Sequence, residues 1–531
     1  MLTRTPVSIS RLRLHNIHPT PHFQNKPLTI TRRLTMASTP SPESFQALII
    51  GSGQAGTPLA VAFAKAGHKT ALIDRAHIAG CCVNEGCTPT KTLIASGRAA
   101  YLMRRGQDYG NHTSSPGKDG KNEVIVDMQR IRERKRQIVE SFRGGSEKRV
   151  AEAGVTVLMG GAEFVDGKTV KVVMNDGGSD KLVTADRIII NVGERPARPS
   201  LPGVETLDPS LVLNSTSIQE LDVVPEHLVV VGGGYVGVEF AQYMRRLGAK
   251  VTIVQRGKQL LPREDPDVAG VFLDILTEDG ITTYLSSSTT NISSIPSSTS
   301  SSRPGFTLKL KTPSGALDVQ GSHILFAAGR IPNTDTLNLP TAGVATNEKG
   351  YIVTNPFLET STIDIYALGD VKGPPAFTHI SYDDFRILKS NLLLPPSPDK
   401  PLLTTTGRQD RVPYVVYTDP QLAHVGLHEW EARAKYAALG REGDVKVAKM
   451  PMGYVARALE TDETRGVMKA VVDGTDGRIL GFTCLGMEGG EVMAVVQMAM
   501  LAGTRYEVLQ EAVWAHPSLA ESLNNLWGFL E

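Results

Sequence analysis

Three of the four cysteines in this 531-residue chain lie within seven positions, at Cys81, Cys82 and Cys87. They belong to the segment GCCVNEGCTPTK, residues 80–91, which runs directly into TLIASGRAAYLMRRG. The apolar periodicity of that second segment predicts a helix, and Pro89 suits its first turn. Two thiols separated by four residues at a helix entrance can close a small strained disulfide, and a helix N-terminus lowers the pKa of a thiol. This position predicts redox-active thiols rather than a structural crosslink.

A zinc site is the alternative for clustered thiols. Such a site needs four ligands, and no second CxxC motif or His pair completes the set, so we expect no metal site. Four cysteines are also too few for a disulfide framework, which indicates a reducing compartment and a catalytic use of the thiols.

The elements that must position these thiols include two copies of one pattern. Residues 46–74 predict a strand, a GxGxxG turn, an amphipathic helix and a second strand, and residues 226–256 repeat this plan. From first glycine to strand end, both copies span 23 positions, from 51 to 74 and from 232 to 255. Such glycines let a pyrophosphate approach the N–H groups of a helix N-terminus. The motif glycines are Gly51, Gly53 and Gly56 in the first copy and Gly232, Gly234 and Gly237 in the second. Two copies predict two bound dinucleotides.

The residue that ends each second strand indicates which nucleotide binds. Asp74 can accept hydrogen bonds from both hydroxyls of an adenosine ribose, which suits FAD or NAD. The second copy has the neutral Gln255 there, followed by Arg256 and Lys258, which could hold a 2′-phosphate. We therefore expect NADPH rather than NADH, with a plain surface role for Arg256 as the alternative.

Composition bounds the remaining possibilities. Apolar residues make up 41% and charged residues 21%, the net charge is +1, and no apolar run reaches the roughly 18 residues of a membrane span. We expect two to four domains and neither nucleic-acid nor membrane binding. Residues 1–42 contain no Asp or Glu but six basic residues, which resembles a mitochondrial transit peptide, with a disordered basic tail as the alternative. We expect a mitochondrial protein, with a cytosolic form starting at Met36 conceivable.

Two low-complexity segments predict boundaries. Residues 287–305 are Ser-rich and predict a disordered surface insertion within the second nucleotide domain. Residues 393–410 are rich in Pro and Thr and predict a linker into a C-terminal domain that mixes strands and helices.

The cysteine segment resembles the GGTCxNxGCxPSK signature of the class I pyridine nucleotide-disulfide oxidoreductases, the group of dihydrolipoamide dehydrogenase, glutathione reductase and mercuric reductase. Further matches are FAAGRIPN at 326–333, IYALGDVKGPPAFTH at 365–379 and AHPSLAE at 515–521, and the resemblance covers about residues 44–531. Cys81 stands at the family's Thr position and Ala79 at a Gly position, both departures. The resemblance implies that Cys82 and Cys87 are the working pair.

The resemblance also implies roles for single residues. Cys82 would attack the substrate, Cys87 would face the flavin, and Lys91 would lie near flavin N5, balanced by Glu239. His516, with Glu521 as its orienting carboxylate, would be the acid–base of a homodimer in which it completes the partner's active site. Other histidines such as His424 are expected at the surface. The expected FAD-binding residues are Gly51, Gly53, Gly56, Asp74, Lys91, Ala162, Gly193, Asp370, Ala376, Phe377, Thr378 and His379. The expected NADP-binding residues are Gly232, Gly234, Tyr235 (a gate over the nicotinamide pocket), Gly237, Glu239, Gln255, Arg256 and Gly329.

The implied fold is α/β, with two Rossmann-like dinucleotide-binding domains and a C-terminal α+β dimerisation domain. We expect a tail at 1–43, an FAD-binding domain at 44–195 and 332–408, an NAD(P)-binding domain at 196–331 and a dimerisation domain at 409–531. The implied activity passes reducing equivalents from NADPH through FAD to Cys82–Cys87 and on to a disulfide, a thiol-reactive compound or a metal ion, as in mercuric reductase. Dihydrolipoamide dehydrogenase and a diaphorase that reduces quinones or dioxygen are the alternatives.

Overall fold

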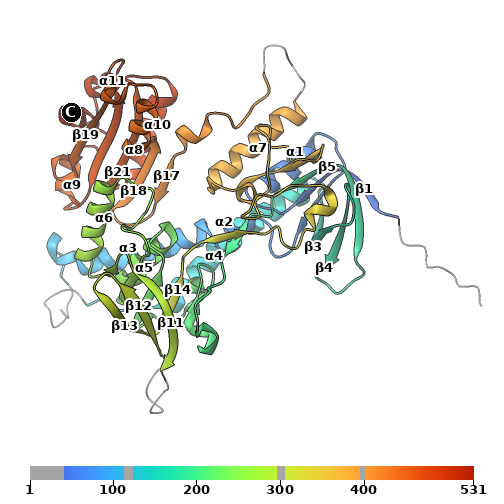
Figure 1. The fold of residues 1–531 in the computed structure, drawn as a ribbon, viewed down its shortest axis with the longest axis horizontal. Coiled ribbons are helices and arrows are strands. Elements are labelled where there is room, and N and C mark those ends of the chain that lie inside the picture. Colours follow the sequence, from blue (N-terminus) through green and yellow to red (C-terminus); the bar gives the residue numbers. More distant parts are fainter. Residues whose placement is uncertain (1–40, 113–122, 296–304, 395–396, 398–400) are drawn as a thin grey trace, which may run out of the picture. The chain divides into compact units, whose positions relative to one another are not determined.

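The computed structural model describes residues 41–112, 123–295, 305–394, 397 and 401–531, and over these residues the chain forms five sheets (Figure 1). Residues 1–40, where the tail or transit peptide is predicted, lie outside the described residues. Residues Pro42–Glu531 make up one unit, to which the following description applies. None of its described helices is both long enough and apolar enough to cross a membrane.

The first sheet is built around a central parallel strand. β1 pairs in parallel with β2 and β5, β2 pairs with β3, β5 pairs with β16, and β4 joins β3 and β5 in antiparallel fashion. The strands are β1 Glu43–Ile50, β2 Thr70–Asp74, β3 Thr156–Phe164, β4 Thr169–Met174, β5 Lys181–Ile190 and β16 Ile365–Ala367. The last four residues of β1 are fully buried, as expected for a strand covered on both faces.

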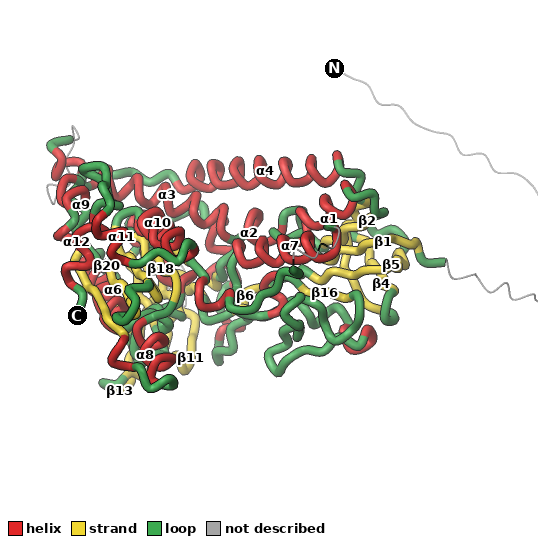
Figure 2. Tube along the Cα trace, turned by 90° about the horizontal axis from the view of Figure 1, so that it is seen from above, coloured by secondary structure: helices red, strands yellow, loops and turns green. Residues whose placement is uncertain are grey.

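Three helices cover one face of this sheet. They are α1 Gly56–Lys65, which connects β1 to β2, α4 Met128–Glu152 and α7 Thr378–Leu393. Phe63 of α1 and Phe385 of α7 share one apolar core with Ile49 of the sheet. Figure 2 shows the three helices on the same side of the strands. The glycine turn between β1 and α1 is thereby held at the carboxyl end of the central strand.

The second sheet repeats this arrangement with five parallel strands in the order β10-β9-β8-β14-β7. The second glycine turn lies between β8 and α5, and α5 leads into β9. The elements are β7 Val212–Leu213, β8 His227–Val231, α5 Tyr235–Leu247, β9 Lys250–Val254, α6 Pro266–Glu278, β10 Thr282–Tyr284 and β14 His323–Phe326. Both predicted Rossmann-like units are therefore present, which confirms that part of the predicted fold.

The prediction of a disordered insertion at 287–305 is wrong for its first half. Ser288–Ile295 forms β11, which pairs with β12 Gly305–Thr312, and β12 pairs with β13 Gly315–Gly321. The β-branched residues among the serines suit a strand, and Ile292 is fully buried in a core with Phe306. Residues 296–304 lie outside the described residues.

The C-terminal part is an antiparallel sheet in the order β17-β18-β21-β20-β19 with helices packed on it. It matches the predicted α+β domain. Its strands are β17 Tyr414–Val416, β18 Gln421–Gly426, β19 Val445–Pro451, β20 Val467–Asp473 and β21 Ile479–Gly486. Its helices are α8 Glu429–Ala437, α9 Ala456–Glu460, α10 Gly489–Leu501, α11 Tyr506–Glu511 and α12 Ser522–Leu526. A separate antiparallel pair, β6 Glu194–Pro196 with β15 Arg330–Pro332, links the segments that flank the second sheet.

One helix of the first nucleotide unit reaches the second. α3, Cys87–Arg104, packs on α5, and a Cβ placed on Gly97 would lie 3.0 Å from the ring of Tyr243. Leu93 of α3 shares an apolar core with Phe240 and Met244 of α5. The helix that begins at a cysteine is thus fixed against the helix that follows the second glycine motif.

Candidate active site

Cys82 and Cys87 lie in two consecutive helices. Cys82 is in the short helix α2, Gly80–Asn84, and Cys87 is the first residue of α3. Both are free thiols. The hydroxyl of Thr378, the first residue of α7, donates to Cys82 Sγ at 3.1 Å and lies 3.4 Å from Cys87 Sγ. The structure thus brings the two cysteines and one of the expected FAD-binding residues into one site.

The pKa values of the two thiols are shifted in opposite directions. A hydrogen bond between them raises the pKa of Cys82 far above its ordinary value, and burial acts in the same direction. The same hydrogen bond lowers the pKa of Cys87 to about 6, against burial, and Thr378 and Lys91 lower it further. A thiolate on Cys87 and a proton on Cys82 is therefore the stable state of the reduced pair at neutral pH.

Lys91 and Glu239 form an ion pair between the two nucleotide units. Lys91 Nζ, on α3, lies 2.7 Å from a carboxylate oxygen of Glu239 on α5. Burial by itself lowers the pKa of Lys91, but the attraction of Glu239 outweighs it and the pKa is raised. The other carboxylate oxygen of Glu239 accepts from the backbone N–H of Tyr417 at 2.7 Å, and Lys91 Nζ lies 5.0 Å from the Tyr417 ring centroid. Tyr417 lies in no recognisable sequence motif, so its contacts with Glu239 and Lys91 were not predicted.

A cavity lies between the first glycine turn and the cysteine segment. Seven of the expected FAD-binding residues line it, namely Gly51, Gly53, Asp74, Ala162, Gly193, Asp370 and Thr378, together with Cys81 and Cys82. The glycine turn has no room for side chains: a Cβ on Gly51 would lie 2.3 Å from a backbone oxygen, and one on Gly56 would lie 2.1 Å from another. A backbone cradle with a carboxylate at the strand end fits the diphosphate and ribose of FAD.

Asn191, which sequence reasoning missed, holds the glycine turn in place. It follows the last residue of β5, its Oδ1 accepts from Gly56 N–H at 2.8 Å, and its amide donates to Leu368 O at 2.8 Å. The carboxylate of Asp74 accepts from Ser52 N–H at 2.9 Å. A polar residue directly after an apolar strand was the available signal for Asn191.

The remaining expected FAD-binding residues lie outside the residues that line this cavity. Gly56 is the first residue of α1, and Lys91 is paired with Glu239. Ala376 and His379 are exposed, and the ring of Phe377 stacks on that of His379 with centroids 5.3 Å apart.

Asp370 is a half-buried acid that lines the cavity. Burial raises its pKa to about 6, and the nearby Glu194 adds to the shift. Arg330 lies 3.4 Å from a Glu194 carboxylate oxygen and donates to Cys81 Sγ at 3.7 Å. Burial raises the pKa of Cys81 to about 11, so this third thiol is held neutral beside the cavity.

The second glycine unit holds the expected NADP-binding residues. Gly232, with φ +114°, and Gly234 form the turn, Tyr235 and Gly237 are in the first turn of α5, and Gly329 precedes β15. Gln255 turns back onto this loop, where its Oε1 accepts from Gly233 N–H at 3.1 Å. Arg256 is exposed and makes no hydrogen bond or ion pair with any residue that the structure describes.

The prediction that His424 is a surface group is wrong. His424 is 2% exposed, because β18, which carries it, is covered by the rest of its sheet. Its ring stacks on that of His428, with centroids 3.8 Å apart. Tyr235 and His424 both contact the ring of Tyr414, at centroid distances of 5.5 and 5.2 Å.

His516 is placed at the surface of the C-terminal part. Its Nδ1 lies 3.0 Å from both carboxylate oxygens of Glu521, and its side chain is 67% exposed. The expected orienting contact is thus present. His516 makes no hydrogen bond to the cysteine pair within the described part of the same chain.

Comparison with known proteins agrees with this geometry. Residues 45–384 match the model of the pyridine nucleotide-disulphide oxidoreductase family, and residues 412–526 match the dimerisation domain of that family. The chain is 34% identical to the probable pyridine nucleotide-disulfide oxidoreductase RclA of Escherichia coli, over 92% of this chain and 99% of that protein. It is 32% identical to a mercuric reductase of Staphylococcus aureus, over 90% and 81%. The solved Cu(II) complex of the HOCl-induced flavoprotein disulfide reductase RclA from E. coli superimposes with a TM-score of 0.78 at 33% identity, over 92% and 99%.

The prediction of a mitochondrial protein is overturned by these relatives. They are bacterial proteins, which points to a cytosolic protein. The basic, hydroxyl-rich composition of residues 1–42 is weak evidence for a transit peptide, because composition alone identifies neither a cleavage site nor a contact with an import receptor.

The matches cover both the nucleotide-binding part and the C-terminal sheet, so they account for nearly all of the described residues. The family depends on FAD and a pyridine nucleotide, and its name describes electron transfer between a pyridine nucleotide and a disulfide. The dimerisation domain supports a homodimer. The chain therefore belongs to the pyridine nucleotide-disulphide oxidoreductase family and is an NAD(P)H-dependent flavoprotein oxidoreductase.

Proposed function

We propose that this protein is an NADPH-dependent flavoprotein disulfide reductase that uses Cys82 and Cys87 to reduce a disulfide, a thiol-reactive compound or a metal ion. The observation that carries the proposal is the geometry of the two thiols: Cys82 lines the cavity, Cys87 begins α3, and the hydroxyl of Thr378 lies 3.1 and 3.4 Å from their sulfurs. Cys87, at a helix N-terminus near Lys91, has a pKa lowered to about 6, whereas Cys82 keeps its proton. Thiols at a helix N-terminus beside a cation are typical of redox-active pairs.

The chain's own residues then have separate tasks. FAD, when bound, supplies the transfer of two electrons between the nicotinamide and the cysteine pair. Those two electrons and one proton convert the Cys82–Cys87 disulfide into the Cys82 thiol and the Cys87 thiolate. For a disulfide substrate, Cys82 loses its proton to His516 of the partner subunit and attacks one sulfur, and the other sulfur leaves as a thiolate that takes this proton. The Cys87 thiolate, with the positive charge of Lys91 beside it, then attacks Cys82, which re-forms the Cys82–Cys87 disulfide and releases the second substrate thiolate. Glu521 holds the imidazole in the orientation that leaves Nε2 free for this proton.

We further propose that the domain limits follow the predicted ranges, with FAD on 44–195 and 332–408, NADPH on 196–331 and dimerisation through 409–531. The preference for NADPH rests on the lack of a carboxylate at Gln255 and on the exposed, unpaired guanidinium of Arg256 among the described residues. A strand-end carboxylate would repel a 2′-phosphate, whereas Arg256 would attract it.

The proposed substrate class rests on the cysteine pair and on the activities named for two similar proteins. One relative is a mercuric reductase, and another is an HOCl-induced disulfide reductase described as a Cu(II) complex. Both are consistent with a thiol pair that meets oxidants or soft metal ions. A dihydrolipoyl dehydrogenase activity is the second candidate, because such enzymes are also similar over 90% of this chain, at 28% identity.

The test is an anaerobic titration of the FAD-loaded protein with NADPH, followed by absorbance spectroscopy. A broad long-wavelength band between thiolate and flavin, absent in Cys87→Ser, would support the relay. Bleaching of the flavin without such a band would mean that the cysteines are not connected to it, and would favour a diaphorase that acts on quinones or dioxygen. Turnover of a diaphorase would also survive Cys82→Ser.

The nicotinamide preference is tested on the same sample. The apparent KM for NADPH should be lower than that for NADH, and Arg256→Ala should raise the NADPH value about tenfold, equivalent to roughly 1.4 kcal/mol, while leaving NADH almost unchanged. An equal effect on both nucleotides would contradict the phosphate-binding role.

A further inference from the structure

Tyr414 lies where three parts of the chain meet. It is the first residue of β17 in the C-terminal sheet. Its ring centroid lies 5.5 Å from that of Tyr235, which follows the second glycine turn, with the planes 31° apart. It also stacks on the ring of Phe377, at a centroid distance of 5.7 Å and an angle of 6°. Phe377 precedes Thr378, whose hydroxyl contacts both active-site sulfurs. One ring of the C-terminal part thus contacts both nucleotide units.

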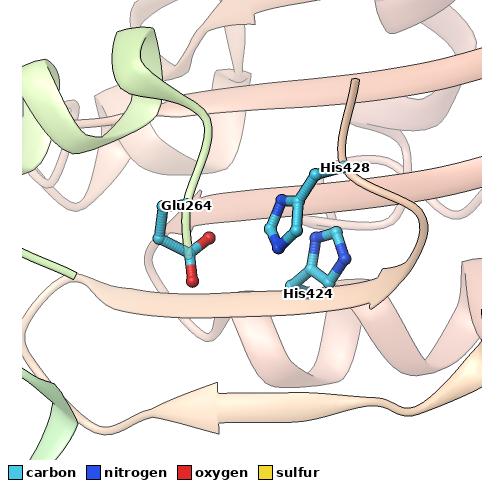
Figure 3. Close-up of side chains that lie close together, drawn as sticks. All are labelled: Glu264, His424 and His428. Carbon is cyan, nitrogen blue, oxygen red and sulfur yellow. The ribbon is translucent and has the colours of Figure 1, made fainter. Parts of the chain in front are cut away.

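Three buried side chains hold Tyr414 in one orientation. Its hydroxyl donates to a carboxylate oxygen of Glu264 at 2.6 Å and lies 3.1 Å from Nε2 of His428. Its ring contacts that of His424, with centroids 5.2 Å apart. Figure 3 shows Glu264, His424 and His428 close together, and none of the three is more than 5% exposed. Tyr414 therefore has little freedom to rotate, because its hydroxyl has two polar partners and its ring is packed among other rings.

Tyr235 is held less firmly than Tyr414. Its hydroxyl is buried but makes no well-formed hydrogen bond to any residue that the structure describes. Burial raises the pKa of Tyr235 to about 12, and the charge of the nearby Glu264 acts in the same direction. A buried hydroxyl without a partner is unfavourable. The side chain is therefore held by packing, which includes its contacts with the rings of Tyr414 and Phe377 at centroid distances of 5.5 and 6.5 Å.

We propose that Tyr414 is a positioning residue that holds the ring of Tyr235 in the nicotinamide pocket until NADPH displaces this ring. The inference rests on the proposed function, in which Tyr235 is the gate over that pocket. The ring contacts of Tyr235 support this role, because they extend from the second glycine turn to the loop before Thr378. NADPH bound on the second glycine turn must bring its nicotinamide to the flavin of the first unit, so the nicotinamide has to pass this ring.

The closed position of the ring competes with the nucleotide. Because the ring must leave before the nicotinamide can bind, the apparent Kd for NADPH exceeds the intrinsic value by the inverse of the open fraction. An interaction that stabilises the closed position therefore weakens apparent binding, and its loss tightens binding. Loss of one aromatic pair corresponds to about a fivefold change in such an equilibrium. Through Tyr414, the C-terminal sheet thereby affects how readily the nucleotide reduces the flavin.

The test measures the reductive half-reaction of the FAD-loaded full-length protein. Flavin reduction is followed anaerobically by rapid-mixing absorbance spectroscopy over a range of NADPH concentrations, which gives the apparent Kd. Tyr414→Leu removes the ring, and we expect this Kd to fall about fivefold. Tyr414→Phe keeps the ring but loses both contacts of the hydroxyl, so a smaller fall is expected. The fold-changes should be the same with NADH, because both nucleotides carry the same nicotinamide.

A double variant shows whether Tyr414 acts through Tyr235. In a Tyr235→Ala background, where no ring is left to position, Tyr414→Leu should leave the Kd for NADPH unchanged. The compound 2′-phospho-ADP-ribose lacks the nicotinamide, so its Kd should be the same in the parent and in Tyr414→Leu. Tyr436→Phe is the matched control for Tyr414→Phe, because it removes another buried hydroxyl–carboxylate bond of the C-terminal part, to Asp473 at 2.7 Å. This control should bind NADPH like the parent.

The outcomes separate this inference from the proposed function. If neither NADPH nor NADH reduces the flavin of the parent, the proposed function fails and this inference fails with it. If the parent is reduced, but the folded Tyr414→Leu and Tyr414→Phe variants keep or raise the parent Kd, the positioning role of Tyr414 is wrong. An equal fall in the Tyr235→Ala background, or for 2′-phospho-ADP-ribose, would also overturn it, since Tyr414 would then act on the fold of the pocket rather than on Tyr235.

Discussion

At the scale of the residue, Lys91 influences the charge state of the cysteine site. It lies in the first turn of the helix that begins at Cys87 and lowers the pKa of that thiol, while its partner Glu239 raises it. The net shift in the pKa of Cys87 therefore depends on both Lys91 and Glu239. Because a lysine and a glutamate act in opposite directions on one thiolate, their removal should have opposite results.

We expect the midpoint of Cys87 ionisation in the reduced protein near pH 6, with the thiolate present above it. Lys91→Met should raise this midpoint by about one pH unit, because it removes a nearby positive charge and leaves Glu239 unpaired. Glu239→Gln should lower it. The measurement is the pH dependence of the long-wavelength absorbance under anaerobic conditions. Shifts in the same direction for both variants would contradict the assignment of charges.

At this scale, sequence reasoning found residues that belong to local motifs. Cys82, Cys87 and Lys91 lie within ten positions, and the roles expected for them came from the resemblance of this segment to the family signature. Asn191 could not be found in this way, because its function is a hydrogen bond to Gly56, 135 positions away. His424 was misplaced for the same reason: its burial depends on neighbouring strands rather than on its own segment.

At the scale of the element, the glycine turns show why some positions tolerate no side chain. The turn before α1 is closed so tightly that the Cβ of an alanine at Gly56 would lie 2.1 Å from the backbone oxygen of Gly51. That oxygen belongs to a backbone held by Asp74 and Asn191 nearby and cannot move freely. The turn is thus fixed by sterics as well as by hydrogen bonds.

We expect Gly56→Ala to lose bound flavin, because the turn must open and move the N–H groups that face the dinucleotide. Flavin content after purification, from the absorbance ratio of flavin to protein, measures this. Gly161→Ala is the control: this glycine lines the cavity itself, and an added Cβ meets no protein atom within 4 Å. Equal flavin loss in both variants would mean that general disturbance of the cavity, rather than the turn, is responsible.

Helix α4 offers a second prediction at this scale. Gly144 lies in the interior of this 25-residue helix, is exposed, and has no atom within 4 Å of an added Cβ. Gly144→Ala should stabilise the helix by about 1 kcal/mol, because glycine has the greater conformational freedom to lose. Amide exchange in α4 should slow by about fivefold, as measured by mass spectrometry. No change in exchange would indicate that α4 opens only with the rest of the sheet unit.

Most elements could be predicted from the periodicity of the sequence. The two glycine units appear where expected, and the C-terminal part mixes strands and helices as predicted. β11 was missed because serine is frequent in disordered segments, and its single fully buried side chain, Ile292, gives a weak signal. The strand β11 is stabilised by pairing with β12, and a pattern taken from residues 287–305 alone cannot predict this pairing.

At the scale of the whole molecule, the role proposed for His516 depends on a second chain. Its imidazole is exposed and oriented by Glu521, but it makes no hydrogen bond to the cysteine site within the described residues of its own chain. The family's dimerisation domain supplies the surface through which a partner would approach. An acid–base residue that serves the other subunit makes each active site a product of two chains.

We expect complementation between two inactive variants. Cys82→Ser and His516→Gln homodimers should each lose disulfide reduction. After dissociation and random reassociation, half the dimers are mixed, and each mixed dimer has one intact site, so about a quarter of the parent activity should return. Reassociation of each variant with itself is the control and should restore none. If His516 served its own chain, the mixture would also stay inactive.

The contact of α3 with α5 has a consequence for recombining these proteins. The helix that begins at Cys87 is joined to the second nucleotide unit by the ion pair of Lys91 with Glu239, and Gly97 lets the middle of this helix pack closely against Tyr243. A chimera that took residues 196–331 from a relative would exchange one half of each of these contacts and keep the other. Such a graft would keep both contacts only when the donor supplies an acid and an aromatic ring at the positions of Glu239 and Tyr243.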